Sequence, residues 1–189
     1  MRDSLDKEIF EHIEILKSIS SISDDIEAAI KAINTALSAG NKLLMFGNGG
    51  SAADAQHFAA EMVGRFLKNR KALPAIALTT DTSIITAVAN DFGFDEIFKR
   101  QIEALAKPGD IVIGFSTSGN SSNVIEAFEY ARANIENCKI IGFSGKDGGK
   151  MAKLCDINLF VPSENTPIIQ QCHEFIYHFI CKKTEESLF

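Results

Sequence analysis

The sequence predicts a single α/β domain in which helices sandwich a mostly parallel, five-stranded sheet. Three observations support this class. The chain has 189 residues, 46% of them hydrophobic, which is enough for one well-buried core. Short apolar runs of strand length alternate with stretches of helix length. No long linker, low-complexity segment or solenoid-type repeat divides the chain, so residues 1–189 are expected to form one unit.

Five apolar runs bounded by turn residues are the expected strands. They cover residues 42–47, 74–79, 110–116, 139–144 and 157–162. Helices are expected between them over residues 51–68, 94–106, 121–135 and 146–154, with a last helix near 166–184. Strands that alternate with helices form right-handed βαβ units, so we expect a flavodoxin- or Rossmann-like sheet.

Two amphipathic helices are expected in residues 1–40, ahead of an α/β body over residues 41–189. Apolar residues recur at helical spacing at Leu5, Ile9, Ile13, Leu16, Ile22, Ile26, Ile30, Ile33 and Leu37. Ser23, followed by two aspartates, indicates a helix start, and Gly40 indicates a stop. Apolar faces ahead of a complete domain need cover, so we expect these helices to serve oligomerisation. The alternative is that they pack only on their own sheet.

Composition excludes several classes of protein. The net charge of −6 argues against a surface for nucleic acid or for an anionic membrane. The N-terminal residues carry charges every few positions, unlike a signal peptide or a membrane span. The cysteines show no metal-type spacing and are expected to be reduced and mostly buried: Cys138, Cys155, Cys172 and Cys181. We therefore expect a cytoplasmic protein that binds neither nucleic acid nor membrane.

The stretch GNGGSAADAQHFAAE, residues 47–61, begins like a dinucleotide-binding loop. Gly47, Gly49 and Ala52 fit the pattern G-x-G-x-x-G/A. Such a site also needs an acidic residue about 20 positions further on, which binds a ribose hydroxyl. No carboxylate follows residue 61 before Asp81, and no G-K-[ST] follows the glycines. The sequence therefore excludes both a dinucleotide site and a P-loop.

Two loops rich in small polar residues follow expected strands. The first contains Asn48, Gly49, Gly50 and Ser51, and the second is STSGNSSN, residues 116–123. Hydroxyls and free backbone N–H groups at a helix N-terminus suit a phosphate. Capping of the next helix by Ser121 or Ser122 is the alternative. Because the carboxyl ends of parallel strands meet at one edge, two such loops favour a ligand site there.

Polar residues on two otherwise apolar helices are the candidate chemical groups. His57 and Glu61 are four residues apart, which suits either a metal pair or a proton-transfer pair; an exposed hydrogen bond is the alternative. The last helix carries Gln170, Gln171, His173, Glu174 and His178. At about 100° per residue, Gln171 lies about 20° from His178 and Gln170 about 80°, so geometry slightly favours Gln171 as its companion. His173 is expected to be a satisfied core residue.

These motifs together resemble the sugar isomerase (SIS) domain proteins, and within them the phosphoheptose isomerases. The resemblance covers nearly the whole chain. It rests on GNGGSAADAQHFAAE, on AND at residues 89–91, on STSGNS at residues 116–121 and on the spacing from Gln170 to His178. It implies a homotetrameric, cytoplasmic SIS fold. It also implies conversion of sedoheptulose 7-phosphate to D-glycero-D-manno-heptose 7-phosphate, the first step of bacterial heptose synthesis, whether for lipopolysaccharide or capsule.

The resemblance also implies site residues. Glu61 and His178 would be the catalytic acid/base pair. The phosphate would lie on Ser116, Thr117, Ser118 and Ser121. The rest of the substrate would contact Asn48, Gly49, Gly50, Ser51, Glu61, Asn90, Asp91 and Gln170. One Zn²⁺ per subunit would be bound by His57, Glu61, Gln170 and His178, so the family pattern selects Gln170 over Gln171. Gln is a weak zinc ligand, and a Glu61 bound to zinc is a poorer base, which leaves open whether the metal is catalytic or structural.

Two other functions remain open on the sequence. One is a non-catalytic SIS protein that binds a partner such as a replication initiator. The other is a sensor that only binds a sugar phosphate. Both acid/base positions are present, which disfavours the first, and the chain has no room for the DNA-binding domain that sensors usually carry.

Overall fold

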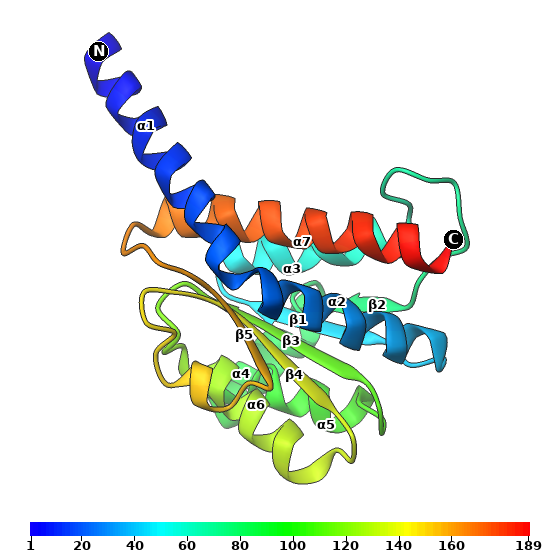
Figure 1. Ribbon diagram of the computed structural model, residues 1–189. Coiled ribbons are helices and arrows are strands. Elements are labelled where there is room, and N and C mark those ends of the chain that lie inside the picture. Colours follow the sequence, from blue (N-terminus) through cyan, green and yellow to red (C-terminus); the bar gives the residue numbers. More distant parts are fainter.

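The computed structural model describes residues 1–189 and contains a five-stranded sheet between two layers of helices (Figure 1). The strands are β1 (Leu43–Gly47), β2 (Ala75–Ala77), β3 (Ile111–Ser116), β4 (Lys139–Gly145) and β5 (Ile157–Val161). Their order in the sheet is β2-β1-β3-β4-β5, and every pairing is parallel. The predicted α/β class is therefore confirmed, and the sheet has the flavodoxin-like strand order.

Two hydrophobic cores lie on the two faces of this sheet. On one face pack α2 (Ser23–Ser38), α3 (Gly50–Val63) and α7 (Thr166–Leu188), which contribute to a core cluster of 29 buried residues. On the other face lie α4 (Thr82–Phe92), α5 (Lys99–Leu105) and α6 (Ser122–Asn134), with a smaller cluster of 13. The central strands β1 and β3 are buried along their whole length, as their continuous apolar runs predict.

Helix α4 was not predicted from the sequence. It begins after Asp81, whose side chain accepts a hydrogen bond from the backbone N–H of Ile84, and it ends at Gly93. None of its residues is fully buried. Ile85, Val88, Ala89 and Phe92 recur at helical spacing, and the first three pack against the smaller core, so the sequence did carry a helical signal here.

The expected helix over residues 146–154 was wrong. Only Met151–Lys153 form a short 3-10 turn, because Lys146, Gly148 and Gly149 all have positive φ angles that break a right-handed helix. The expected helix over 94–106 is a 3-10 turn, Phe94–Glu96, followed by α5. The helix expected over 51–68 ends earlier, at Val63.

The two N-terminal helices differ in their packing. Helix α2 starts at Ser23 as predicted and buries Ile26, Ala29, Ile33, Ala36 and Leu37 in the larger core. Helix α1 (Arg2–Ser18) has no buried residue and projects away from the body (Figure 1). The α/β body is therefore incomplete without α2, and only α1 is an extension.

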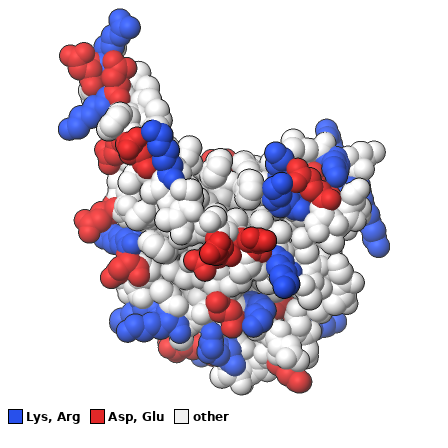
Figure 2. All heavy atoms as spheres, in the orientation of Figure 1, with Lys and Arg blue, Asp and Glu red and all other residues white.

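The remaining surface features fit the composition. No helix combines the length and the apolar character needed to cross a membrane. On the face drawn in Figure 2, basic and acidic side chains are interspersed, and neither sign forms a continuous patch. All four cysteines are free; Cys172 and Cys181 are buried, and Cys138 and Cys155 are partly buried.

Candidate active site

The two polar loops lie next to each other at the point where the strand order of the sheet reverses. The first follows β1 and the second follows β3, and these strands are paired in register up to Gly47 and Phe115. From β1 the chain crosses to β2 on one side and then returns to β3 on the other. Ligands of open α/β sheets bind at this topological switch point, outside the carboxyl ends of the strands.

The first loop brings backbone close to a side chain of α7. Gly49 has a φ of 58°, and α3 begins directly after it at Gly50. A Cβ atom on Gly50 would lie 2.8 Å from Cδ of Gln170, so any larger residue would require that flexible side chain to move. Ser51 is buried at the start of α3. The predicted residues Gly50 and Gln170 therefore lie in contact.

The side chain of Asn48 connects the two loops. Its amide nitrogen donates to Oδ1 of Asn123 at 2.9 Å, and the amide of Asn123 donates back to Oδ1 of Asn48 at 2.9 Å. Asn123 is buried near the start of α6. This reciprocal pair uses the polar groups of Asn48 within the protein, a role that the sequence did not predict.

Hydroxyl groups gather in the second loop. Oγ of Ser116 lies 2.8 Å from Oγ of Ser121 and 3.5 Å from Oγ of Ser118. Ser121 is the N-cap residue of α6, yet its side chain makes no capping hydrogen bond. The alternative that Ser121 only caps the helix is therefore not supported. Three hydroxyls converge at the N-terminus of a helix, where its free N–H groups favour an anion.

Helices α3 and α7 lie side by side and run in the same direction. Near the start of α3, Gly50 lies against Gln170 of α7. In the middle of α3, His57 lies next to Glu174. Beyond the end of α3, Phe66 is bound by Glu185. Each helix presents one histidine and one glutamate four residues apart, His57 with Glu61 and Glu174 with His178. The pairs face one another across the two helices.

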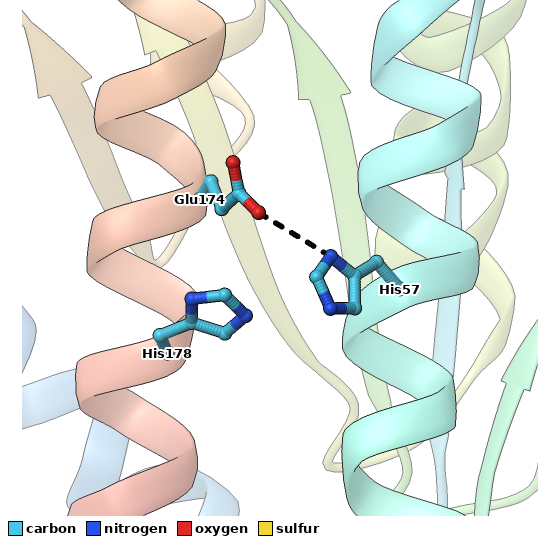
Figure 3. A group of neighbouring side chains, drawn as sticks. All are labelled: His57, Glu174 and His178. Carbon is cyan, nitrogen blue, oxygen red and sulfur yellow. Dashed lines mark ion pairs between the residues drawn. The ribbon is translucent and has the colours of Figure 1, made fainter.

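His57 is the centre of this group. Its Nε2 lies 3.2 Å from Oε1 of Glu61, while its Nδ1 lies 2.9 Å from the hydroxyl of Tyr177 and 3.5 Å from Oε1 of Glu174 (Figure 3). Ligand atoms of His57, Glu174 and His178 all lie within 4.8 Å of one another. The two nitrogens of His57 thus face different partners, Nε2 toward Glu61 and Nδ1 toward α7.

His178 is held between aromatic rings. Its ring centroid is 4.9 Å from that of His57, edge to face, and 5.4 Å from that of Phe66, stacked at 29°. Burial lowers the pKa of His178 below its ordinary value, and the neighbouring His57 acts in the same direction, against the carboxylates of Glu174 and Glu61. The predicted residues His57, Glu61 and His178 are therefore brought together.

Helix geometry predicted the wrong glutamine. Gln170 contacts Gly50 on the α3 side, whereas Gln171 is exposed beside α1. A helical wheel assumes a contact stripe parallel to the axis, but a neighbouring helix packs along the inclined i±4 row. Gln170, Glu174 and His178 form such a row. Glu174 lies on this row next to His57, although from the sequence it was only one of several polar residues on the last helix.

Two further titratable residues near this group were missed. Asp54 precedes His57 by one turn; burial and the Glu174 carboxylate raise its pKa to about 7, while His57 acts in the opposite direction. One carboxylate oxygen of Asp54 is buried without a hydrogen bond. Burial also raises the pKa of Tyr177, so its hydroxyl stays protonated beside His57. The sequence did offer a signal for both residues: Asp54 lies three positions before His57, and Tyr177 lies three positions after Glu174, the spacing of neighbours on a helix face.

His173 lies outside the site, in the core. It is fully buried, and its Nε2 donates to the backbone oxygen of Ser144 at 3.0 Å. Burial lowers its pKa to about 4, so the ring is neutral at neutral pH. This is the satisfied core histidine that the sequence predicted, although its Nδ1 has no partner.

Asn90 and Asp91 are not joined to the other site residues within one chain. Both are exposed on α4, which covers the opposite face of the sheet from α3 and α7, and they bond to each other at 2.7 Å. Asp95, four residues after Asp91, accepts a hydrogen bond from Ser122 at the start of α6. Their contact with the substrate stays a prediction.

Comparison with known proteins agrees with this geometry. The SIS domain family model matches residues 10–145. The phosphoheptose isomerase of Aliarcobacter butzleri is 53% identical over 189 residues, covering 100% of this chain and 99% of the relative. That of Syntrophotalea carbinolica is 58% identical over 166 residues, covering 88% and 84%. The chain therefore belongs to the SIS domain family.

Solved structures place the chain within that family. The structure of phosphoheptose isomerase from Neisseria gonorrhoeae is similar with a TM-score of 0.91 at 40% identity, covering 98% of each chain. A phosphoheptose isomerase from Francisella tularensis gives a TM-score of 0.92 at 36% identity, covering 97% of each chain. The chain groups with the phosphoheptose isomerases, which are aldose–ketose isomerases.

Proposed function

We propose that this protein converts sedoheptulose 7-phosphate to D-glycero-D-manno-heptose 7-phosphate, with Glu61 and His178 as its acid/base pair. One observation carries the proposal. Two glutamate–histidine pairs face each other across α3 and α7, beside a loop whose hydroxyls suit a phosphate. The high identity to phosphoheptose isomerases over the full chain supports the same activity.

The serine loop would hold the phosphate. Ser116, Ser118 and Ser121 offer hydroxyl donors, Thr117 lies between them, and the N-terminus of α6 adds backbone N–H groups. Binding energy at the phosphate, remote from the reacting carbons, would align those carbons with the groups on α3 and α7. Gly49 and Gly50 would let the sugar lie close to the backbone of the first loop.

The reaction moves a proton between C1 and C2 through an enediol. The Glu61 carboxylate would accept the carbon-bound proton from C1 of the ketose and return it to C2. His178 would move the proton between the two oxygens. Each transfer by a positioned side chain contributes typically about 10²–10⁴-fold to the rate. The apolar stacking of His178 on Phe66 fixes the direction in which its imidazole points.

Ligand atoms of His57, Glu174 and His178 lie within 4.8 Å of one another, close enough for one metal ion, and Oε1 of Glu61 lies 3.2 Å from Nε2 of His57. Nε2 of His57 faces the Glu61 carboxylate, while Nδ1 faces Tyr177 and Glu174, the arrangement in which a ligating histidine is oriented by a second partner. His57, Glu61, Gln170 and His178 would hold the ion, and Glu174 would orient His57. Bound zinc would polarise the substrate oxygens and stabilise negative charge on them.

Association into a homotetramer is part of the proposal. Helix α1 exposes Leu5, Ile9, Phe10, Ile13 and Leu16. A groove of about 750 Å³ between the N-terminal helices and α7 is lined in part by the exposed rings of Phe175 and Phe179. Apolar surfaces of this kind mark interaction sites, and a second copy of the chain would cover them. Analytical ultracentrifugation of the full chain, compared with Ile9→Asp, tests this: the variant should lose the tetramer.

Turnover of sedoheptulose 7-phosphate by the purified chain tests the proposed activity. The assay is run after chelation of metal and again after addition of zinc. Formation of the aldose phosphate supports the proposal, with more product in the presence of zinc. No turnover under either condition would instead favour a non-catalytic SIS protein or a sugar-phosphate sensor.

A further inference from the structure

The segment that follows α3 is held by one carboxylate, that of Glu185 on α7. Its oxygens accept hydrogen bonds from the backbone N–H groups of Phe66, Leu67 and Lys68 at 2.8, 2.8 and 2.9 Å. Nε of Arg70 donates to the same carboxylate at 2.9 Å. Both side chains are buried, with exposed fractions of 1% for Arg70 and 2% for Glu185. Burial alone would raise the pKa of Glu185, but these donors hold it below its ordinary value.

Arg70 uses its other nitrogens to cap the C-terminus of α3. Nη2 donates to the backbone oxygen of Glu61 at 2.8 Å, and Nη1 donates to that of Met62 at 2.7 Å. The last four carbonyls of a helix have no partner within the helix, and the helix dipole makes this end attractive for a cation. The cap therefore binds the backbone of Glu61 itself, one of the two proposed catalytic residues.

Arg70 and Glu185 are also linked to His178, through Phe66. The ring of Phe66 stacks on the His178 ring with centroids 5.4 Å apart, and Glu185 binds the backbone N–H of Phe66. Glu185 lies seven residues after His178, two turns along the same side of α7. Arg70 and Glu185 thus bind the backbone of Glu61 and the residue against which His178 packs.

We propose that Arg70 and Glu185 are positioning residues of the isomerase. Together they fix the C-terminal end of α3, which carries Glu61, and the Phe66 ring, which orients His178. This inference rests on the proposed function, because positioning has meaning only if Glu61 and His178 act on a substrate. Neither Arg70 nor Glu185 is expected to touch the substrate.

A purely stabilising role explains less of this arrangement. A buried ion pair is often no more stabilising than apolar residues of similar volume. Apolar side chains, however, could not donate to the carbonyls at the end of α3 or accept from three consecutive N–H groups. The directional bonds set the position of the segment, and a displacement of about 1 Å at a reacting group can cost about 10²-fold in rate.

The test compares kcat and KM for Glu185→Gln, Arg70→Lys and Phe66→Leu with the wild type. Glu185→Gln replaces a carboxylate acceptor with an amide that faces a cluster of donors. Arg70→Lys removes the guanidinium that reaches the carbonyls of α3. Phe66→Leu removes the ring beside His178 and leaves the buried ion pair intact. We expect kcat per mole of folded protein to fall about 10- to 100-fold, with KM within about twofold, because the phosphate site lies on other elements. The folded fraction is measured by circular dichroism at the assay temperature.

A neighbouring ion pair of α7 is the matched control. Lys183 and Glu186 form an exposed pair at 2.6 Å on the same helix, so Glu186→Gln, which removes the charge of the carboxylate, should leave kcat unchanged. Wild-type kcat in Arg70→Lys, or a rise in KM without a fall in kcat, would overturn the inference. If the buried variants do not fold, Phe66→Leu decides, and wild-type kcat in that variant overturns it too.

Failure of the proposed function gives a different result. In that case the wild-type chain itself shows no turnover of sedoheptulose 7-phosphate. An active wild type with unaffected variants contradicts the positioning role alone.

Discussion

Gln170 lies directly over Gly50, so close that a Cβ atom on the glycine would be 2.8 Å from the side-chain carbon Cδ. This contact joins the first loop of the site to α7. Glycine fits here because it has no Cβ atom; its φ angle is not positive.

Gly50→Ala should displace the amide of Gln170, which is the end of a flexible side chain. The free energy of unfolding, measured with urea, should therefore fall by less than the roughly 1–3 kcal/mol typical of overpacking a core. In the double variant Gly50→Ala, Gln170→Ala the clash is absent, so the two effects should not add. Additive losses would show that the two residues do not interact.

Ser121→Ala should weaken substrate binding. A hydrogen bond to a charged group contributes about 1.5–3 kcal/mol, so KM should rise about 10- to 100-fold with little change in kcat. Ser122→Ala is the control, since the Ser122 hydroxyl donates to Asp95 and not to the serine cluster. An equal effect of both substitutions on KM would contradict a phosphate site at Ser121.

Removal of zinc ligands should separate ligands from the residue that orients them. His57→Ala should abolish zinc binding measured by calorimetry, while Glu174→Gln should weaken it by about 10- to 100-fold, the usual effect of losing an outer partner. Equal loss in the two variants would make Glu174 a direct ligand and would put the proposed set with Gln170 in doubt.

The protein should become less stable as the pH is lowered, because His173 is buried in its neutral form. Its pKa is 6.5 when exposed and about 4 in the fold, so the unfolded chain binds more protons between these values. The His173 contribution is therefore complete above pH 6.5 and is lost as the pH falls toward 4. The loss at pH 4 is roughly 3 kcal/mol at about 1.4 kcal/mol per pH unit.

His173→Gln keeps a side-chain donor for the backbone oxygen of Ser144 and cannot titrate. The free energy of unfolding of this variant should therefore depend less on pH between 6.5 and 4. Identical pH dependence in the variant and the wild type would show that other groups cause the slope.

Much of the fold followed from the sequence, because apolar runs and turn residues are local signals. The five strands, the start of α2 at Ser23 and the polar loops after β1 and β3 were all predicted. Helix α4 was missed, although Ile85, Val88 and Phe92 recur in it at helical spacing. The packing of α2 on its own sheet was only the alternative to oligomerisation, because amphipathicity shows that one face of a helix is covered but does not identify the covering element.

Some features of the site could likewise be predicted from the sequence, and others depend on contacts between distant segments. The pair of His57 and Glu61 follows from helical spacing alone. The contact between Glu174 and His57 depends on how α7 is inclined against α3, which no spacing within one helix reveals. The bond from Arg70 to Glu185 joins residues 115 apart and has no local signal at all.

Turnover of sedoheptulose 7-phosphate by Glu61→Gln and His178→Gln tests the proposed acid/base pair, with Gln171→Ala as an exposed control on α7. Substrate binding is measured in parallel by calorimetry on metal-free protein, because both residues are also proposed zinc ligands. We expect kcat to fall about 10²–10⁴-fold in each of the first two variants, both variants to bind the substrate still, and the control to turn over normally. Normal turnover by either Glu61→Gln or His178→Gln would contradict the proposed acid/base pair.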